Sequence, residues 1–203
     1  MIIGKDQVLE WLAKGEETSG NLADIPWQVR DSGKFLVLEN PRLPFSIFMV
    51  FENSFIRIFM RTGIETAVIE NRQRLAICRV LLILNSQIDL VKFMLDGLNE
   101  EVVSRVDLDL ENLTKEEMND GMNMLLSSLF LMVQALHLED EFRERVRERT
   151  ILMIQDMLAK GKKPAEIRDF LTRSIGISQK EAESLLSRFI MTEGDKSHSE
   201  MYG

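Results

Sequence analysis

The sequence has few of the residues that build covalent or metal-bound frameworks. It contains one cysteine and two histidines among 203 residues. A single cysteine excludes a disulfide framework and a multi-cysteine zinc site. No histidine lies near Cys78 in the sequence to activate its thiol,. We therefore expect Cys78 to be a packed residue and the protein to hold no metal.

Long apolar runs and low-complexity stretches are also missing. Four prolines and eleven glycines are too few for a linker-like chain,. The longest apolar run, from Leu75 to Leu84, contains Arg79 and is about half of the roughly 20 residues that a membrane-spanning helix needs,. The amino terminus has no basic segment followed by a sustained apolar run, as a signal peptide would,. These absences predict a cytoplasmic protein that does not bind a membrane.

Sequence motifs of common enzyme classes are absent. There is no Gly-x-x-x-x-Gly-Lys-[Ser/Thr], Gly-x-Ser-x-Gly or Gly-x-Gly-x-x-Gly,. Asp107, Asp109 and Glu111 have the alternating spacing of a calcium loop, but Asn112 and Met118 stand where that loop needs Gly and Glu,. On a strand, this spacing places the carboxylates outward along a solvated edge. We predict no enzyme activity and no cofactor, although carboxylates that meet only in the folded chain leave no trace in a sequence.

Charge divides the chain unevenly. The formal net charge is -8, which disfavours binding to nucleic acid and to anionic lipid,. Residues 1–138 contain 13 basic and 20 acidic residues, whereas residues 139–193 contain 11 of each. Strand signals also end near residue 138. We therefore predict an α+β domain at 1–138, a helical domain at 139–193 and a flexible tail at 194–203.

Within the first domain, strand signals alternate with helix signals. A helix is expected at 5–14, and two further helices are expected from the capping signals Thr62-Gly63-Ile64-Glu65 and Thr114-Lys115-Glu116-Glu117,. The first of these two, over 65–84, is expected to be mostly buried. Strands are expected at 35–38, 45–52, 55–61, 91–95 and 101–109, the last two joined by a hairpin at Asp96-Gly97,. The pattern predicts helices packed on an antiparallel sheet.

The strand at 45–52 is partly apolar on both faces,. A sheet face in contact with water usually carries polar residues. We therefore expect the carboxy-terminal helices, a second subunit or a client chain to cover the second face. Methionines on the helix after Thr114 suit such a surface, although they fill core gaps more often. The candidate partner or dimer surface consists of Phe45, Ile47, Phe48, Met49, Val50, Phe51, Met118 and Met122.

The region after residue 138 predicts only helices. Their expected ranges are Asp140 to Ala159, Pro164 to Ser174 and Ser178 to Met191,. The turn at 174–178 resembles that of a helix-turn-helix. However, Lys180 and Arg188 are offset by Glu181 and Glu183, which leaves no positive surface to neutralise phosphates,. A compact helical appendage is the favoured interpretation, and DNA binding is the alternative.

The order of elements over residues 33–137 resembles the YbjN group, which shares its fold with type III secretion chaperones. The resemblance rests on the hydrophobic pattern together with Asn85, Phe93, Asp96 and Gly97. It implies helices on a twisted antiparallel sheet, frequent dimerisation and no established enzymatic chemistry. It also implies that apolar patches hold an extended segment of another protein. The carboxy-terminal helices lie outside the resemblance and could cover that surface.

We therefore predict a non-enzymatic protein-interaction module that forms a homodimer and binds a partner polypeptide in a chaperone-like way. The alternative is a nucleic-acid-linked regulator that uses the helix-turn-helix-like region at 164–190.

Overall fold

The computed structural model describes residues 2–16, 19–41, 43, 45–175 and 177–187. The chain divides into two compact units, which are Met1–Asn40 with Phe45–Glu139 and Pro41–Pro44 with Asp140–Gly203. Unit 1 contains an antiparallel sheet with helices, and the described part of unit 2 after residue 139 is helical. The predicted α+β fold class is confirmed. The expected tail at 194–203 and the end of the last expected helix, 188–191, lie outside the described residues.

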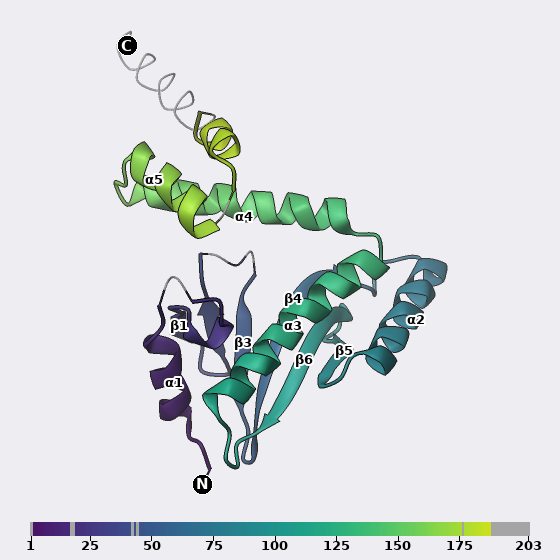
Figure 1. The fold of residues 1–203 in the computed structure, drawn as a ribbon. Helices are drawn as coiled ribbons and strands as arrows, with labels where there is room; N and C mark the ends of the chain where they lie inside the picture. The colour runs from purple at the N-terminus through teal and green to yellow at the C-terminus, as the bar shows by residue number, and fades with distance from the viewer. Residues whose placement is uncertain (1, 17–18, 42, 44, 176, 188–203) are drawn as a thin grey trace. The chain divides into compact units, whose positions relative to one another are not determined.

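The sheet of unit 1 has six strands in the order β1-β2-β3-β4-β6-β5, and every pair is antiparallel. Figure 1 shows the helix α3 lying across the sheet and α2 beside β5. The elements of unit 1 are α1 (Lys5–Ala13), the short 3-10 helix η1 (Leu22–Asp24), β1 (Gln28–Asp31), β2 (Leu36–Glu39), β3 (Ile47–Phe51), β4 (Phe55–Glu65), α2 (Asn71–Gln87), β5 (Val91–Asp96), β6 (Glu101–Asp109) and α3 (Lys115–Ala135).

The predicted helix start at Thr62 is wrong. Residues 62–65 continue β4, and the pairing with β6 shifts register between Arg61 and Glu65. Gly63 adopts a φ of 71° there, and the Thr62 hydroxyl donates a hydrogen bond of 2.8 Å to the carbonyl of Val102. Thr62 and Glu65 thus belong to a β-bulge and not to a helix start, and Gly63 supplies the left-handed conformation that the bulge requires,. The helix begins only at Asn71.

Strand β1 was not expected from the sequence. Three of its four residues, Gln28–Asp31, are polar, which is typical of a loop, yet they pair with β2 from Gln28↔Glu39 to Asp31↔Leu36. In the turn between the two strands, Gly33 has a φ of 82° and donates its backbone N–H to the Asp31 carboxylate. An edge strand can carry polar residues because one of its sides lies open to water.

The helix α3 covers one face of the sheet, which we call the helix face. Its start is fixed by the predicted capping box, in which Thr114 and Glu117 exchange hydrogen bonds of 2.9 and 3.1 Å. Ser128 on the helix meets Ser104 on β6, with 2.9 Å between their hydroxyl oxygens. Gly121 allows close approach, because a Cβ there would lie 3.1 Å from Leu108 of β6.

The helix α2 reaches the edge strand β5 through one side chain. The Asn85 amide accepts a 2.7 Å hydrogen bond from the Phe93 backbone N–H and donates one of 3.0 Å to the Phe93 carbonyl. Asn85 thus occupies both outward backbone groups at the middle of β5. Such cover prevents another chain from adding to the edge at this point.

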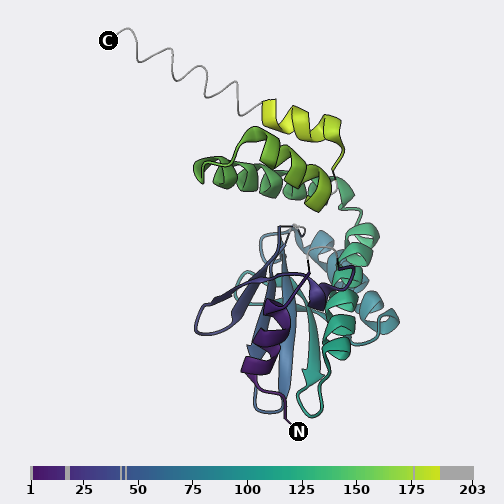
Figure 2. The same ribbon diagram turned by 60° about the vertical axis from the view of Figure 1, so that its left-hand side comes forward.

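Unit 2 forms a small helical core of its own. It contains α4 (Glu139–Ala159), α5 (Pro164–Phe170), the π-helical turn η2 (Leu171–Ile175) and a helix at 179–187. Figure 2 shows α5 beside α4. The Ser178 hydroxyl accepts a hydrogen bond of 3.3 Å from the Glu181 backbone N–H and so caps the last helix,. The core residues are Ile154, Ile167, Leu171, Ala182, Leu185 and Leu186.

Candidate interaction surface on the sheet

The sheet face opposite α3, which we call the far face, carries several rows of side chains, two of which lie at its centre. Ser104 and Leu108 of β6 point toward α3, so the alternate residues of that strand point away from it,. The strand register aligns these residues with neighbours on the other strands. One row crosses all six strands through Arg30, Val37, Phe48, Phe59, Arg105 and Lys92, and a shorter row consists of Val50, Arg57 and Asp107.

The middle of the far face is aromatic. The rings of Phe48 and Phe59 are stacked, with centroids 5.2 Å apart and an interplanar angle of 18°. Phe35 packs edge-on against both rings, at centroid distances of 5.4 and 6.4 Å. We call these three residues, all half-buried, the phenylalanine cluster. Each ring covers part of the others, which explains how apolar side chains occupy a face that α3 does not cover.

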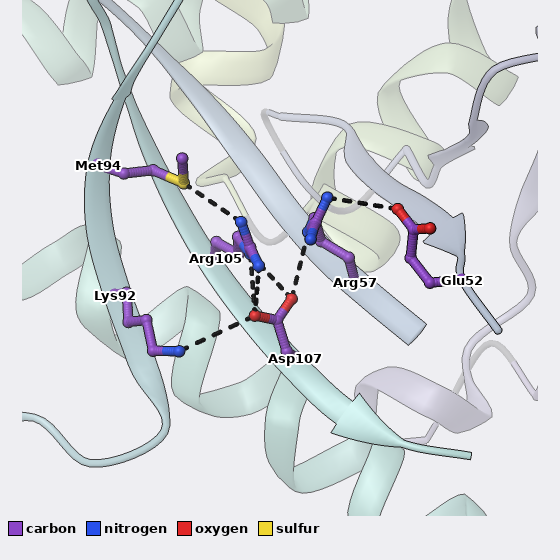
Figure 3. Close-up of polar contacts among 6 residues, drawn as sticks. All are labelled: Glu52, Arg57, Lys92, Met94, Arg105 and Asp107. Atoms are coloured by element: carbon purple, nitrogen blue, oxygen red, sulfur yellow. Dashed lines mark hydrogen bonds and ion pairs between the residues drawn. The ribbon is translucent and has the colours of Figure 1, made fainter. Parts of the chain in front are cut away.

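Beside the phenylalanine cluster lies an ionic cluster centred on Asp107 (Figure 3). The Arg105 guanidinium donates to both carboxylate oxygens of Asp107, at distances from 2.5 to 3.0 Å. Arg57 donates to Asp107 at 3.3 Å and pairs with Glu52 at 3.6 Å. Lys92 lies 3.9 Å from the same carboxylate. Three cations therefore share two carboxylates, and one positive charge remains in excess.

Two opposing effects act on the pKa of the Asp107 carboxyl. Burial alone would raise its pKa, but the hydrogen bonds and charges of Arg105 and Arg57 outweigh burial and hold the pKa below its ordinary value,. The Asp107 side chain is only 22% exposed because β6 is an interior strand. The expectation of a solvated edge at Asp107 is therefore wrong. Its carboxylate faces outward on the strand, but cross-strand arginines cover it.

The cationic side chains also contact apolar groups. The Arg57 guanidinium lies 5.3 Å from the centroid of the Phe55 ring, and Arg105 reaches the sulfur of Met94 at 3.8 Å. Packing of this kind places cationic groups against apolar surface. The far face therefore offers an aromatic middle with Arg30 at one edge and the ionic cluster toward the other. Such a surface can accept apolar and acidic side chains together.

The structure separates the partner-surface residues expected from the sequence into two sets. Ile47, Met49, Met118 and Met122 have no exposed surface and belong to the core. The half-buried set consists of Phe45, Phe48, Val50 and Phe51, of which Phe48 and Val50 lie on the far face.

Sequence reasoning missed most of the far face. Phe35, Phe59, Arg57 and Arg105 were not singled out, although strand alternation from Phe55 places Phe55, Arg57, Phe59 and Arg61 on one side,. What no single strand could indicate was the register that brings Phe59 beside Phe48 and Arg57 beside Asp107. This surface can be predicted only when the residues of two paired strands are considered together.

Two further properties concern the described residues only. Among them, no group of three or more His, Cys, Asp and Glu side chains is placed to hold a metal ion. No helix in the same part of the chain is long and apolar enough to cross a bilayer.

Comparison with known proteins gives structural neighbours. The chain is similar to YbjN from E. coli, described as a candidate transcription regulator, with 15% identity, a TM-score of 0.49 and coverage of 70% of this chain and 96% of that one. It is also similar to an uncharacterized protein from Methanothermobacter thermautotrophicus, with 13% identity, a TM-score of 0.46 and coverage of 66% and 96%.

Comparison by sequence concerns both units. No curated protein matches the chain. Residues 137–203 match the family HTH_78, described as a domain of unknown function. Residues 7–136, which are more than half of the chain, match a second domain of unknown function. The chain belongs to that second family, DUF8183.

Proposed function

We propose that this chain is a non-enzymatic protein-interaction module that holds a polypeptide segment of a partner on the far face. The observation that supports this proposal is the phenylalanine cluster beside an ionic cluster with an excess positive charge, on the side of the sheet that α3 leaves uncovered. Apolar surface flanked by charged residues is typical of sites where proteins meet.

The chemistry of the far face specifies the partner segment. Aromatic or branched apolar side chains would pack on Phe48 and Phe59, where an aromatic pair contributes about 0.5–1.5 kcal/mol beyond its buried area. Acidic side chains would meet the cations at the two ends of the row. Lys92 is 69% exposed, so its ammonium group is accessible to such a carboxylate. Pairs of this kind set register and orientation more than affinity.

The partner binds across the far face and not along β5. Addition of a strand to β5 would need the backbone groups of Phe93, which Asn85 already occupies. Binding to a face depends on side chains, so partners are selected by their sequence.

Selection of displayed random peptides on the full-length protein tests this function. We expect the selected peptides to be rich in apolar and acidic residues and to bind more weakly to the variant Lys92→Glu, in which the new carboxylate repels their acidic side chains. The matched control is Lys14→Glu, which reverses a lysine of similar exposure at the C-cap of α1. Peptides that bind both variants equally well would contradict a role for the far face.

A nucleic-acid-linked role for unit 2 is the second candidate. It is favoured by the three-helix core around Ile154, Ile167 and Leu185, and by the match of residues 137–203 to HTH_78. The charges of the last helix oppose a nucleic-acid-linked role. The exposed Lys180 stands next to the exposed Glu181, and Arg168 is paired with Glu183 at 3.9 Å, so acidic groups offset both cations. Fluorescence anisotropy of the full chain with labelled duplex DNA at low salt tests this candidate. A lack of binding at high protein concentration would exclude it.

A further inference from the structure

The helix α2 is apolar on its inner side and on its outer side. Leu81 and Leu84 are buried, as expected for the side that faces the rest of unit 1. On the outer side, Leu75 is 71% exposed, Leu82 is 69% exposed and Ile83 is 47% exposed. Large apolar side chains that recur at helical spacing normally pack against another element, so these three side chains on the outer side of α2 lack the cover that their spacing predicts,. The expectation of a mostly buried helix here is wrong for this isolated chain.

The exposed apolar residues form a stripe at helical spacing. Leu75, Leu82 and Ile83 stand at positions i, i+7 and i+8, so their side chains lie along one side of α2,. Arg79 stands at i+4 within the same stripe, and Arg72 precedes it by two turns. We call these five residues the outer stripe. Stripes with this period pack against a second helix.

The charge of α2 is opposite to that of the domain that carries it. The helix contains three arginines and no acidic residue, whereas residues 1–138 have seven more acidic than basic residues. Arg74 is neutralised by Glu100 at 2.5 Å. Arg72 and Arg79 are exposed and form no ion pair with any described residue. Two uncompensated cations therefore flank exposed leucines on an acidic domain.

We propose that the outer stripe binds an acidic amphipathic helix of a partner protein. Apolar residues of that helix would cover Leu75, Leu82 and Ile83, and carboxylates spaced two turns apart would meet Arg72 and Arg79. This surface is separate from the far face, so the proposal goes beyond the binding of an extended segment there.

The charges argue against two other occupants. A second copy that paired α2 with α2 about a two-fold axis, with the stripes in register, would bring Arg79 against its own symmetry mate, because Arg79 lies near the middle of the stripe,. An anionic membrane would meet the net negative charge of the whole domain, whereas a single helix meets only the local cations,. The partner helix is the occupant that both the local and the overall charge favour.

Two designed peptides test the proposal with the full chain. Both are fluorescent, alanine-based helices with leucines spaced to face Leu75, Leu82 and Ile83. One carries glutamates at i and i+7, and its twin carries lysines there. We expect the glutamate peptide to bind roughly fivefold more tightly than its twin, with the difference shrinking as salt is raised. The double variant Arg72→Glu with Arg79→Glu should reverse this preference.

A matched variant and two other probes make the test decisive. Lys162→Glu with Lys180→Glu changes the net charge equally within unit 2 and should leave the preference unchanged, with folding of each variant checked by circular dichroism. Equal binding of the two peptides to the wild-type chain would overturn the proposal. So would binding of the wild-type chain to phosphatidylserine vesicles that Arg79→Glu abolishes. A dimer in sedimentation that Leu82→Glu dissociates would also overturn it, because a second copy would then cover the stripe.

Discussion

The rings of Phe48 and Phe59 lie stacked 5.2 Å apart on neighbouring strands, on the side of the sheet away from α3. Residues directly opposite each other in an antiparallel pair stabilise a sheet most directly. Here the pair also leaves aromatic surface half-buried beside Arg105, which stands opposite Phe59 on β6. This arrangement links the stability of the sheet to the surface that we propose for partner binding.

A double-mutant cycle at Phe48 and Phe59 should reveal coupling. We expect each change to alanine to destabilise the domain, and the double variant to lose about 0.5–1.5 kcal/mol less than the sum of the two, because the stacked pair is lost only once. Urea denaturation of the four proteins measures this. Additive losses would mean that the rings do not interact in solution.

Asp107→Asn should remove part of the pH dependence of stability. The pKa of Asp107 is lowered in the folded protein, so its contribution is fully present above the unfolded pKa of about 3.9 and is lost as pH falls through the folded value,. The variant should be less stable at pH 7, and the difference should shrink below about pH 4. Denaturation midpoints across pH measure this, with exposed Asp89→Asn as control. A difference that persists unchanged at pH 3 would contradict the ion-pair account.

Asn85→Ala should loosen the middle of β5. It removes both hydrogen bonds to the backbone of Phe93 and should cost about 1–3 kcal/mol,. The Asn85→Asp variant keeps the acceptor but places a second oxygen against the Phe93 carbonyl, so it should not restore stability. Amide hydrogen exchange at Phe93 is the direct readout. Unchanged protection of that amide in Asn85→Ala would show that the side chain does not guard the edge.

Gly15→Ala should be severely destabilising, whereas Gly20→Ala should be tolerated. A Cβ at Gly15 would overlap the backbone of Ile25 and Pro26, which cannot yield as a flexible side chain could. A Cβ at Gly20 would meet no atom within 4 Å. The close approach at Gly15 joins the end of α1 to the segment before β1. Thermal unfolding of the two variants compares them, and equal melting temperatures would refute the close approach.

Local signals predicted the elements whose partners are near in sequence. The capping box at Thr114, the hairpin at Asp96-Gly97 and the short helix from Lys5 are all confirmed. Each depends on hydrogen bonds or turns between residues a few positions apart, which a sequence displays directly.

The errors arose where distant strands decide the outcome. Thr62 and Glu65 look like a helix start, but pairing with β6 draws them into β4. The polar residues of β1 become a strand only because β2 provides a partner. The far face arises in the same way, since Phe35 and Phe59 meet Phe48 through register alone. The predicted burial of α2 is too high, because apolar residues indicate that a helix packs against another element but not whether that element belongs to the same chain.

Photo-crosslinking in the source cells tests the central claim most directly. A benzophenone amino acid is placed at Lys92 on the far face and, in a second protein, at Lys14 at the C-cap of α1, since the two positions have similar exposure. We predict that irradiation joins another polypeptide to position 92 and not to position 14. Adducts at position 14 with none at position 92 would contradict partner binding on the far face.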